Sequence, residues 1–394
     1  MNHTRWRKLT LLLVSTLTIM SGATIAPSLP AIRETFSGVP NADLWVRLVL
    51  TLPALFIVLG APAAGVVTDR VGRKPLLVAS TVLYGLAGAS GYVLDSLWAI
   101  LAGRAVLGLA VAGVMTSVTT LIGDYYEGQE RGRVLGLQGM FVNLGGVLFL
   151  SFGGVLADIG WRLPFLIYLF AFVLLPLITL LLHEPEREEE PGNGAGLTAL
   201  PLRLLGLVYG AGVVLMIVFY TVPVQLPFYL EETFGASGTL TGFAVATTTL
   251  FGALSSAFYG SVSARLGHVA ILSLCFALMS VGYLLIGLAT SVVLVTAGLA
   301  VGGLGLGLVL PNLNRWTADS VSSTARGRAL SGVTFAIFLG QFLSPLATQP
   351  IADLIGLAAM YIVLAGLLLV LALLSGLLRV PIRHVAEQVQ GETS

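Results

Sequence analysis

The sequence predicts an all-α membrane protein with twelve transmembrane helices arranged in two six-helix bundles. The composition, the lengths of the apolar runs and an internal repeat all support this fold class. Of the 394 residues, 56% are hydrophobic and only 10% are charged, and the mean hydropathy is +0.95. A soluble domain carries roughly 25% charged residues. We therefore expect lipid, and not water, to cover most of the surface.

The charged and metal-ligating residues exclude several classes of protein. The net charge of +1 gives no reason to expect a nucleic-acid partner. Cys275 is the single cysteine, so neither a disulfide within the chain nor a cysteine metal cluster is possible. No residues have metal-ligand spacing, and nothing resembles a nucleophilic catalytic site. We expect no metal, no cofactor and no enzymatic activity.

Apolar runs of about 18 residues or more, the length that crosses a bilayer, predict the helices. The first half contains six such runs, at 9–32, 44–64, 75–94, 97–122, 134–158 and 162–182. The second half contains six more, at 204–229, 238–260, 269–289, 292–313, 329–353 and 357–379. The first run has a basic start like that of a signal peptide, but it is too long and has no clear cleavage site.

An internal repeat relates the two halves. The segment from Gly65 to Lys74 recurs 195 residues later, from Gly260 onward, and the same offset superimposes Asp124 on Asp319. A repeat of this size in an apolar chain indicates a transporter. We predict a first bundle over residues 1–182, a polar cytoplasmic linker over 183–203, and a second bundle with a short tail over 204–394.

The basic residues predict the orientation. Sixteen of the 20 Lys and Arg residues lie in the segments that an even number of helices places on the side of the two termini. The positive-inside rule therefore puts both termini in the cytoplasm. We expect a multi-pass protein of a bacterial inner membrane.

The ten-residue pattern between the second and third helices resembles the signature of the major facilitator superfamily. It reads Gly-x-x-x-Asp-Arg-x-Gly-Arg-Lys, and its members are Gly65, Asp69, Arg70, Gly72, Arg73 and Lys74. Together with twelve spans, the repeat and the linker, the resemblance covers nearly the whole chain. It implies two bundles related by an axis along the membrane normal, around a central cavity that opens alternately to each side.

The resemblance also implies a gating role for the signature. The glycines allow a sharp turn, and the basic residues anchor it at the cytoplasmic face. A carboxylate such as Asp69 needs a partner near a bilayer, and in this family it faces the start of the eleventh helix, here near Arg328. The family also implies an ion pair between Arg73 and Asp124. These contacts would lock the outward-facing state; the alternative is a loop that only sets topology.

Energy coupling is less clearly indicated by the sequence. There is no Walker-type nucleotide motif, so direct use of ATP is not expected. Arg104 in the fourth helix resembles an arginine of proton-driven members, and it can meet backbone carbonyls, water or an anionic substrate, or extend to the outer surface. The acids near the outer mouth are the other coupling candidates: Glu34, Asp43, Glu231 and Glu232.

The fifth helix resembles that of the twelve-helix drug:proton antiporters, with one departure. Gly136, Gly145, Gly153 and Gly154 match the family's glycine series, but Phe149-Leu150 replaces its Gly-Pro pair. Small residues permit close helix contact. Prolines further predict bends in the first, seventh, tenth and eleventh helices, either as moving elements or as static kinks.

Polar and aromatic side chains in the helices are candidates for a substrate site. Aromatics with a few amides suit an amphipathic organic molecule, although each of these side chains can also bond a neighbouring helix. The candidates are Met115, Thr116, Gln138, Asn143, Tyr220, Gln225, Thr248, Asn312, Phe335, Phe338 and Gln341.

The sequence as a whole favours a secondary transporter that exports small amphipathic organic compounds by proton antiport. Its expected partners are a small organic substrate, protons and membrane lipid, and we expect a monomer. Three alternatives remain: export of an endogenous metabolite or siderophore-like anion, uptake by symport, and a membrane receptor that has lost transport.

Overall fold

The computed structural model describes residues 2–185, 201–322 and 325–377, with side chains from residue 5 onward. Throughout these residues every regular element is a helix. The predicted all-α fold class is confirmed. The gaps remove most of the predicted linker and the predicted tail, which therefore lie outside the described residues.

The first half consists of six membrane-crossing units. The first, second and third are α1 (Asn2–Ala23) with η1 (Ala26–Ser28) and α2 (Leu29–Thr35), α3 (Ala42–Val71), and α4 (Arg73–Ala89) with η2 (Ser90–Tyr92). The fourth, fifth and sixth are α5 (Leu97–Tyr125), α6 (Gly128–Ile159), and η3 (Leu163–Leu169) with α7 (Phe170–Leu181).

The second half repeats this arrangement. Its first three units are α8 (Leu202–Phe219) with α9 (Thr221–Phe234), α10 (Gly238–Ala257) with the short α11 (Tyr259–Ser263), and α12 (His268–Gly287). The last three are α13 (Val292–Asp319), α14 (Arg326–Ile355) and α15 (Leu357–Leu377).

The predicted spans agree with these units to within a few residues at most ends. Eleven helical spans in the described part of the chain are long and apolar enough to cross a membrane. The twelfth predicted span is α4, which has 17 residues and continues into η2. Of the expected bends, those in the first and seventh helices are present, because the first unit is interrupted between Ala23 and Leu29 and the seventh at Tyr220. The tenth and eleventh helices, α13 and α14, continue without interruption through Pro311 and Pro345.

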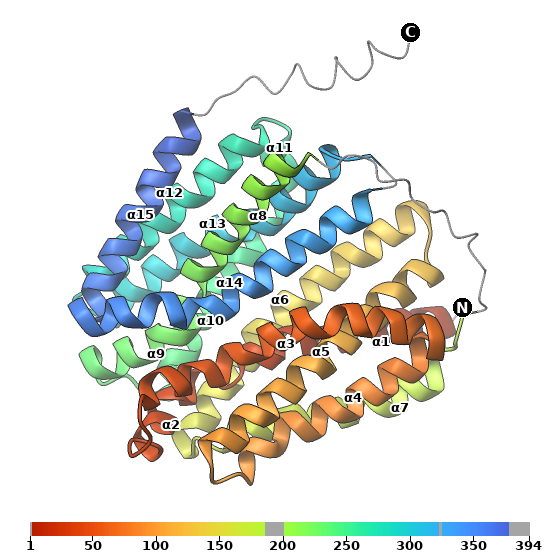
Figure 1. Cartoon of the computed structure of the whole chain (residues 1–394), viewed down its shortest axis with the longest axis horizontal. Helices are drawn as coiled ribbons and strands as arrows, with labels where there is room; N and C mark the ends of the chain where they lie inside the picture. The colour runs from red at the N-terminus through yellow and green to blue at the C-terminus, as the bar shows by residue number, and fades with distance from the viewer. Residues whose placement is uncertain (1, 186–200, 323–324, 378–394) are drawn as a thin grey trace.

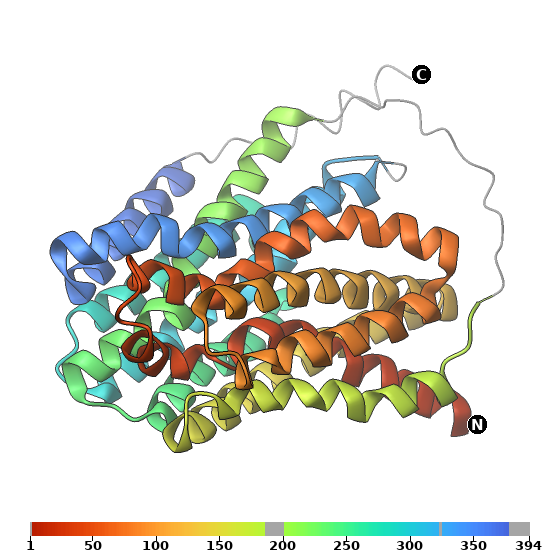
Figure 2. The ribbon, with the colours of Figure 1, turned by 60° about the horizontal axis from the view of Figure 1, so that its bottom comes forward.

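The two halves lie side by side (Figure 1), and two pairs of helices join them: α6 packs on α10, and α3 packs on α14. A second view shows the same division (Figure 2). The α6–α10 contact depends on glycine. A Cβ on Gly154 would lie 2.5 Å from the Gly238 carbonyl oxygen, closer than real Cβ contacts come. Only a hydrogen side chain permits this approach of the two backbones.

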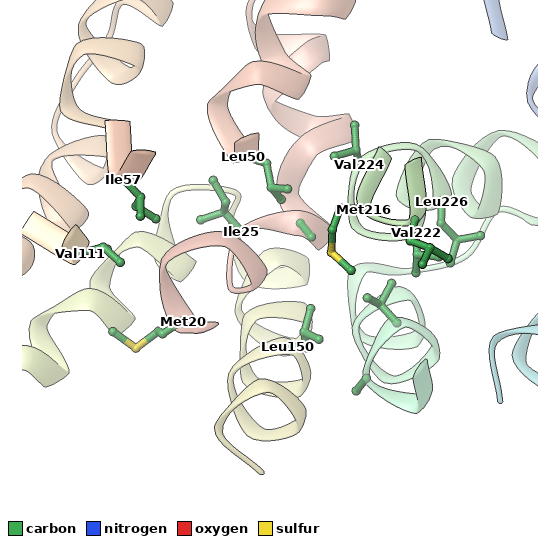
Figure 3. Packing of buried hydrophobic residues seen from close by; sticks show 14 of the residues in the cluster. Met20, Ile25, Leu50, Ile57, Val111, Leu150, Met216, Val222, Val224 and Leu226 are labelled. Atoms are coloured by element: carbon green, nitrogen blue, oxygen red, sulfur yellow. The ribbon is translucent and has the colours of Figure 1, made fainter. Parts of the chain in front are cut away.

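Buried apolar side chains from both halves form one cluster. Figure 3 shows part of it, with Ile25 and Leu50 of the first half facing Met216 and Val224 of the second. All four are at most 6% exposed. The exact limits predicted for the two bundles, 1–182 and 204–394, stay predictions.

Candidate transport pathway

The ends of the helices define two faces of the molecule. We call the face with the start of α1 and the ends of α3 and α5 the terminal face, because both ends of the chain lead to it. We call the opposite face, with the starts of α3 and α5, the distal face. α14 begins at the terminal face and ends at the distal face.

A cavity of about 740 Å³ lies between the halves in the terminal part of the helices. It is formed by α3, α5 and α14, and its lining residues are Ile57, Val58, Ala61, Pro62, Ala112, Met115, Thr116, Thr119, Thr120, Ser331, Gly332, Thr334, Phe335 and Phe338. The volume falls within the usual range for small-molecule sites. Four predicted substrate candidates are among these residues: Met115, Thr116, Phe335 and Phe338.

A polar network at the distal face connects the halves across the pathway. Arg47 Nε donates to Gln225 Oε1 at 2.7 Å, and Gln225 Nε2 donates to Gln349 Oε1 at 3.0 Å. Gln349 Nε2 in turn donates to Asp353 Oδ1 at 2.7 Å. Arg47 is 3% exposed and Gln225 is fully buried. The network therefore joins the two halves through buried side chains, on the side opposite the 740 Å³ cavity.

The guanidinium of Arg47 is neutralised and held in place by its own half and by an aromatic ring. Its Nη1 donates to the backbone carbonyl of Asp43 at 2.7 Å and lies 3.4 Å from Asp43 Oδ1. The guanidinium carbon lies 3.9 Å from the centroid of the Phe228 ring of the second half. A buried cation is costly unless it is paired, and these contacts supply its partners.

The coupling candidates near the outer mouth gather around this network. Asp43 Oδ1 is 2.7 Å from Arg33 Nε, and Arg33 Nη1 is 3.4 Å from Glu232 Oε1 of the second half. Glu34, Asp43 and Glu231 line a distal pocket of about 670 Å³. The structure thus brings all four predicted acids to the distal face, and their role in coupling stays a prediction.

A third contact between the halves at the distal face uses Asp158 at the end of α6. Its Oδ1 accepts a hydrogen bond from the Gly238 N–H at 2.5 Å, and its Oδ2 accepts one from the Thr239 N–H at 2.9 Å. These N–H groups begin α10, so the carboxylate meets the positive end of that helix dipole. Asp158 therefore fixes the same α6–α10 junction that the glycines permit.

Arg104 is packed inside the first half, away from the cavity. It is 1% exposed, and its Nη1 and Nη2 donate to Tyr168 Oη and the Gly88 carbonyl, each at 3.0 Å. Phe165 and Tyr168 lie against it, with ring centroids 4.7 and 4.8 Å from the guanidinium carbon. Of the partners expected for Arg104, a backbone carbonyl, that of Gly88, is observed. Its burial excludes extension to the outer surface in this conformation.

The signature pattern lies at the terminal face, where it caps and pairs helix ends. Arg73 Nε is 3.1 Å from Asp124 Oδ2, so the ion pair implied by the family is present. Asp69 is exposed and forms no hydrogen bond or ion pair with residues 325–377. The expected contact of Asp69 with the start of α14 is thus absent here, as it should be where this face is open. Its gating role stays a prediction.

Glu184, the last residue but one before the first gap, completes the signature site. Its two carboxylate oxygens accept hydrogen bonds from the Arg73 and Lys74 N–H groups, both at 2.7 Å. Gly72, directly before α4, has a φ of 110° and a ψ of 164°. A side chain is strained in this conformation, and a Cβ would also lie 2.7 Å from Glu184 Oε1.

Seven other predicted substrate candidates lie outside the cavity in this conformation. Gln225 belongs to the distal network, and Asn312 is bonded to His268 at the terminal end of α12. Gln138 bonds Ser15, and Asn143 bonds a carbonyl of its own helix. The remaining three, which also do not line it, are Tyr220, Thr248 and Gln341. Their roles in binding stay predictions.

Sequence reasoning missed three residues that make the contacts described above. One is Arg47, although an arginine within an apolar helix is itself a signal. Glu184 stands in a run of loop charges, and His268 departs from the basic repeat. Residues 2–185, 201–322 and 325–377 contain no group of His, Cys, Asp or Glu that could hold a metal.

Comparison with known proteins relates the whole chain to transporters. The chain is 25% identical over 345 residues to the bacillibactin exporter of Bacillus subtilis, and the match covers 83% of this chain and 85% of that protein. It is 29% identical over 338 residues to the class C tetracycline resistance protein of Escherichia coli, covering 79% of this chain and 82% of that protein.

The fold is shared with solved transporters. A bacterial homologue of the human lysosomal transporter Spinster superimposes with a TM-score of 0.80 at 17% identity, covering 96% of this chain and 97% of that one. A D-xylose–proton symporter gives a TM-score of 0.77 at 15% identity, covering 95% and 97%.

The family model described as Major Facilitator Superfamily matches residues 11–226 and again residues 208–394. The two matches together cover both halves of the repeat. The chain therefore belongs to the Major Facilitator Superfamily and is a multi-pass membrane transporter, not an enzyme.

Proposed function

We propose that this transporter exports small amphipathic organic compounds from the cytoplasm by alternating access, driven by proton antiport. The observation that carries the proposal is the asymmetry of the pathway. A cavity of about 740 Å³ is present toward the terminal face, while the Arg47–Gln225–Gln349 network closes the distal face. With both termini in the cytoplasm, as the basic residues favour, this is an inward-facing state that can receive a substrate from inside the cell.

The relatives support export more than uptake. One relative is an exporter by name and another is a tetracycline resistance protein, and each matches about four fifths of this chain. The apolar and aromatic lining of the cavity, with Met115, Phe335 and Phe338, suits an amphipathic molecule. The outer acids, led by Asp43 between two arginines, are the proton carriers that the proposal offers.

The bacillibactin exporter favours a second candidate function, export of a siderophore-like anion. Arg104 gives that candidate no support, because its guanidinium is directed at Tyr168 and the Gly88 carbonyl. No described residue that lines the cavity carries a positive charge.

Proton movement in proteoliposomes with an internal pH-sensitive dye tests the proposal. A lipophilic cation, a neutral amphiphile and a carboxylate siderophore are added in turn. The proposal predicts proton flux with one of the first two compounds and none in liposomes without protein. If only the siderophore gives proton flux, the second candidate is favoured. If none of the three compounds gives proton flux, both candidates are contradicted.

Replacing Arg47 with Gln tests the distal network. The shorter neutral side chain cannot donate as a charged group to Gln225, so the distal face should open more often. We expect at least a fivefold loss of transport with normal expression, because a hydrogen bond from a charged group contributes about 1.5–3 kcal/mol. Arg162→Gln is the matched control, since that arginine pairs with Asp95 within the first half. Equal loss in both variants would argue against a gating role.

A further inference from the structure

The cavity differs from the rest of the pathway in carrying no ionisable group. Its fourteen described lining residues comprise apolar and aromatic side chains, one glycine and five hydroxyl groups, those of Thr116, Thr119, Thr120, Ser331 and Thr334. Neither an acid nor a base is among them, and no amide is either. Recognition of a polar substrate group in this cavity therefore rests on hydroxyls alone.

The orientation of these hydroxyls decides what they offer. Thr120 Oγ1 donates its proton to the Thr116 carbonyl at 2.9 Å, and Ser331 Oγ donates to the Gly327 carbonyl at 3.0 Å. A hydroxyl has one proton and two lone pairs, so a hydroxyl whose proton is engaged by its own helix can only accept. Thr334 Oγ1 likewise donates to the Leu330 carbonyl at 3.4 Å. Thr120, Ser331 and Thr334 thus present only acceptors to the cavity, and a ligand complementary to them must bring donors.

The buried guanidinium of Arg47, at the distal face, is not available to a ligand. Arg47 is engaged with Asp43, Gln225 and Phe228 in the closed distal network. A charged ligand that leaves water for this cavity would find no opposite charge on its described wall. Transfer of a charge to a weakly polar site without a partner is strongly unfavourable.

We propose, on the basis of the proposed export function, that the substrate is an uncharged aromatic amphiphile with hydroxyl or N–H donors. Its ring packs against Phe335, Phe338 and Met115, and its donors bond the hydroxyl oxygens whose own protons are engaged, those of Thr120 on α5 and Ser331 on α14 first. The two halves both contribute to this wall, because α14 supplies both aromatic rings and α5 supplies Met115 and three of the five hydroxyls. A ligand of this kind would bridge the two halves.

Binding of four matched compounds to the purified full-length protein in detergent tests this inference. The compounds are a naphthalenediol, its dimethyl ether, a hydroxynaphthoate and a trimethylammonium naphthol, and affinity is measured by isothermal titration calorimetry. The diol should bind best. Methylation removes the donors and should weaken binding about fivefold. Either charged compound should bind more than about tenfold more weakly than the diol.

Two substitutions locate the effect. Thr120→Val removes an acceptor and should weaken diol binding about fivefold while leaving the dimethyl ether unchanged. Thr247→Val is the matched control, because the Thr247 hydroxyl bonds the Phe243 carbonyl on α10 and does not line the cavity. Thr119→Asp adds a carboxylate to the wall and should bring binding of the trimethylammonium compound to the level of the diol.

The outcomes separate this inference from the proposed function. If the protein binds and exports a charged compound but neither binds nor exports the diol, the substrate is not uncharged. The proposed export function would still hold. The rings can hold a cation by cation–π contact, and the trimethylammonium arm detects that case. Failure of every compound in both binding and efflux would overturn the proposed export function as well. A Thr120→Val effect equal on diol and ether would overturn the donor requirement.

Discussion

The two halves carry equivalent ion pairs at the terminal face, and they differ in one member. The repeat offset of 195 superimposes Arg73 on His268 and Asp124 on Asp319. In the first half Arg73 Nε is 3.1 Å from Asp124 Oδ2, and in the second half His268 Nε2 is 3.2 Å from Asp319 Oδ2. The two contacts are similar in length, although a guanidinium makes one and an imidazole makes the other.

The residues around the two pairs also differ. In the first half Glu184 caps α4 beside the pair. In the second half the other ring nitrogen of His268 lies 3.2 Å from Asn312 Oδ1, and the ring stacks on Trp316 with an angle of 6° between planes. Asn312 Nδ2 donates to the His268 carbonyl, which leaves its Oδ1 as an acceptor. Both ring nitrogens thus lie near oxygen atoms of neighbouring side chains.

The two halves thus hold an equivalent carboxylate in different ways. The first half uses a guanidinium with a permanent charge, whereas the second half uses an imidazole ring that also contacts Asn312 and Trp316. Arg315 Nε lies 3.6 Å from the same carboxylate.

The largest expected difference between the halves comes from their equivalent glycines. Gly72→Ala places a side chain at a φ of 110° and against Glu184, which costs about 1–3 kcal/mol. Gly267→Ala, at the same repeat position, has a φ of −74° and open space, and should change stability by less than about 0.5 kcal/mol. Melting temperatures in detergent micelles check both. Equal shifts would mean that the Glu184 cap is unimportant.

Removing the acid from each pair should give the next largest difference. Asp124→Asn leaves Arg73, whose side chain is only 19% exposed, without its charge partner, at a cost of about 1–3 kcal/mol. Asp319→Asn affects a pair whose acid is 55% exposed, and should cost at most about 1 kcal/mol. Thermal unfolding at pH 7 measures the two costs, and a larger loss in the second half would reverse our comparison.

Exchanging the two basic side chains tests whether the positions are interchangeable. His268→Arg removes the ring that stacks on Trp316 and lies 3.2 Å from Asn312 Oδ1, and should cost about 0.5–1 kcal/mol of stability. Arg73→His should weaken the contact with Asp124, which is 3.1 Å long in the parent protein. Unchanged melting temperatures in both variants would show that neither site is fitted to its own side chain.

Neutralising the helix cap should give the smallest effect. Glu184→Gln keeps an oxygen near the Arg73 N–H but loses the charge at the start of α4, which is worth about 0.3–1 kcal/mol. Raising the salt concentration should shrink the difference from the parent protein. A salt-independent difference would indicate lost packing and not lost charge.

Much of this architecture could be predicted because it is encoded locally. Apolar runs mark the helices, Pro27 and Pro223 mark the breaks near residues 24 and 220, and the repeat marks equivalent positions. The Arg73–Asp124 pair followed from a family pattern. These signals are properties of short segments or of one offset.

The rest depends on partners that are far apart in the sequence. Arg47 meets Gln225 from a helix 178 positions away, and Asp158 meets the start of α10 80 positions away. Arg104 looked like a substrate ligand, yet its partners are a tyrosine and a carbonyl of its own half. No single-sequence pattern distinguishes these outcomes, because each depends on which helices pack together.

Spin-label distances across the two faces test the central claim, that the distal face closes while the terminal face is open. In a Cys275→Ala background, one label pair spans the distal face at Ser37 and Thr290, and another spans the terminal face at Gln129 and Arg265. The account predicts a short distal and a long terminal distance at rest. During turnover in proteoliposomes, a second population should appear with a longer distal and a shorter terminal distance. A distal distance that lengthens while the terminal distance stays fixed would contradict alternating closure of the two faces.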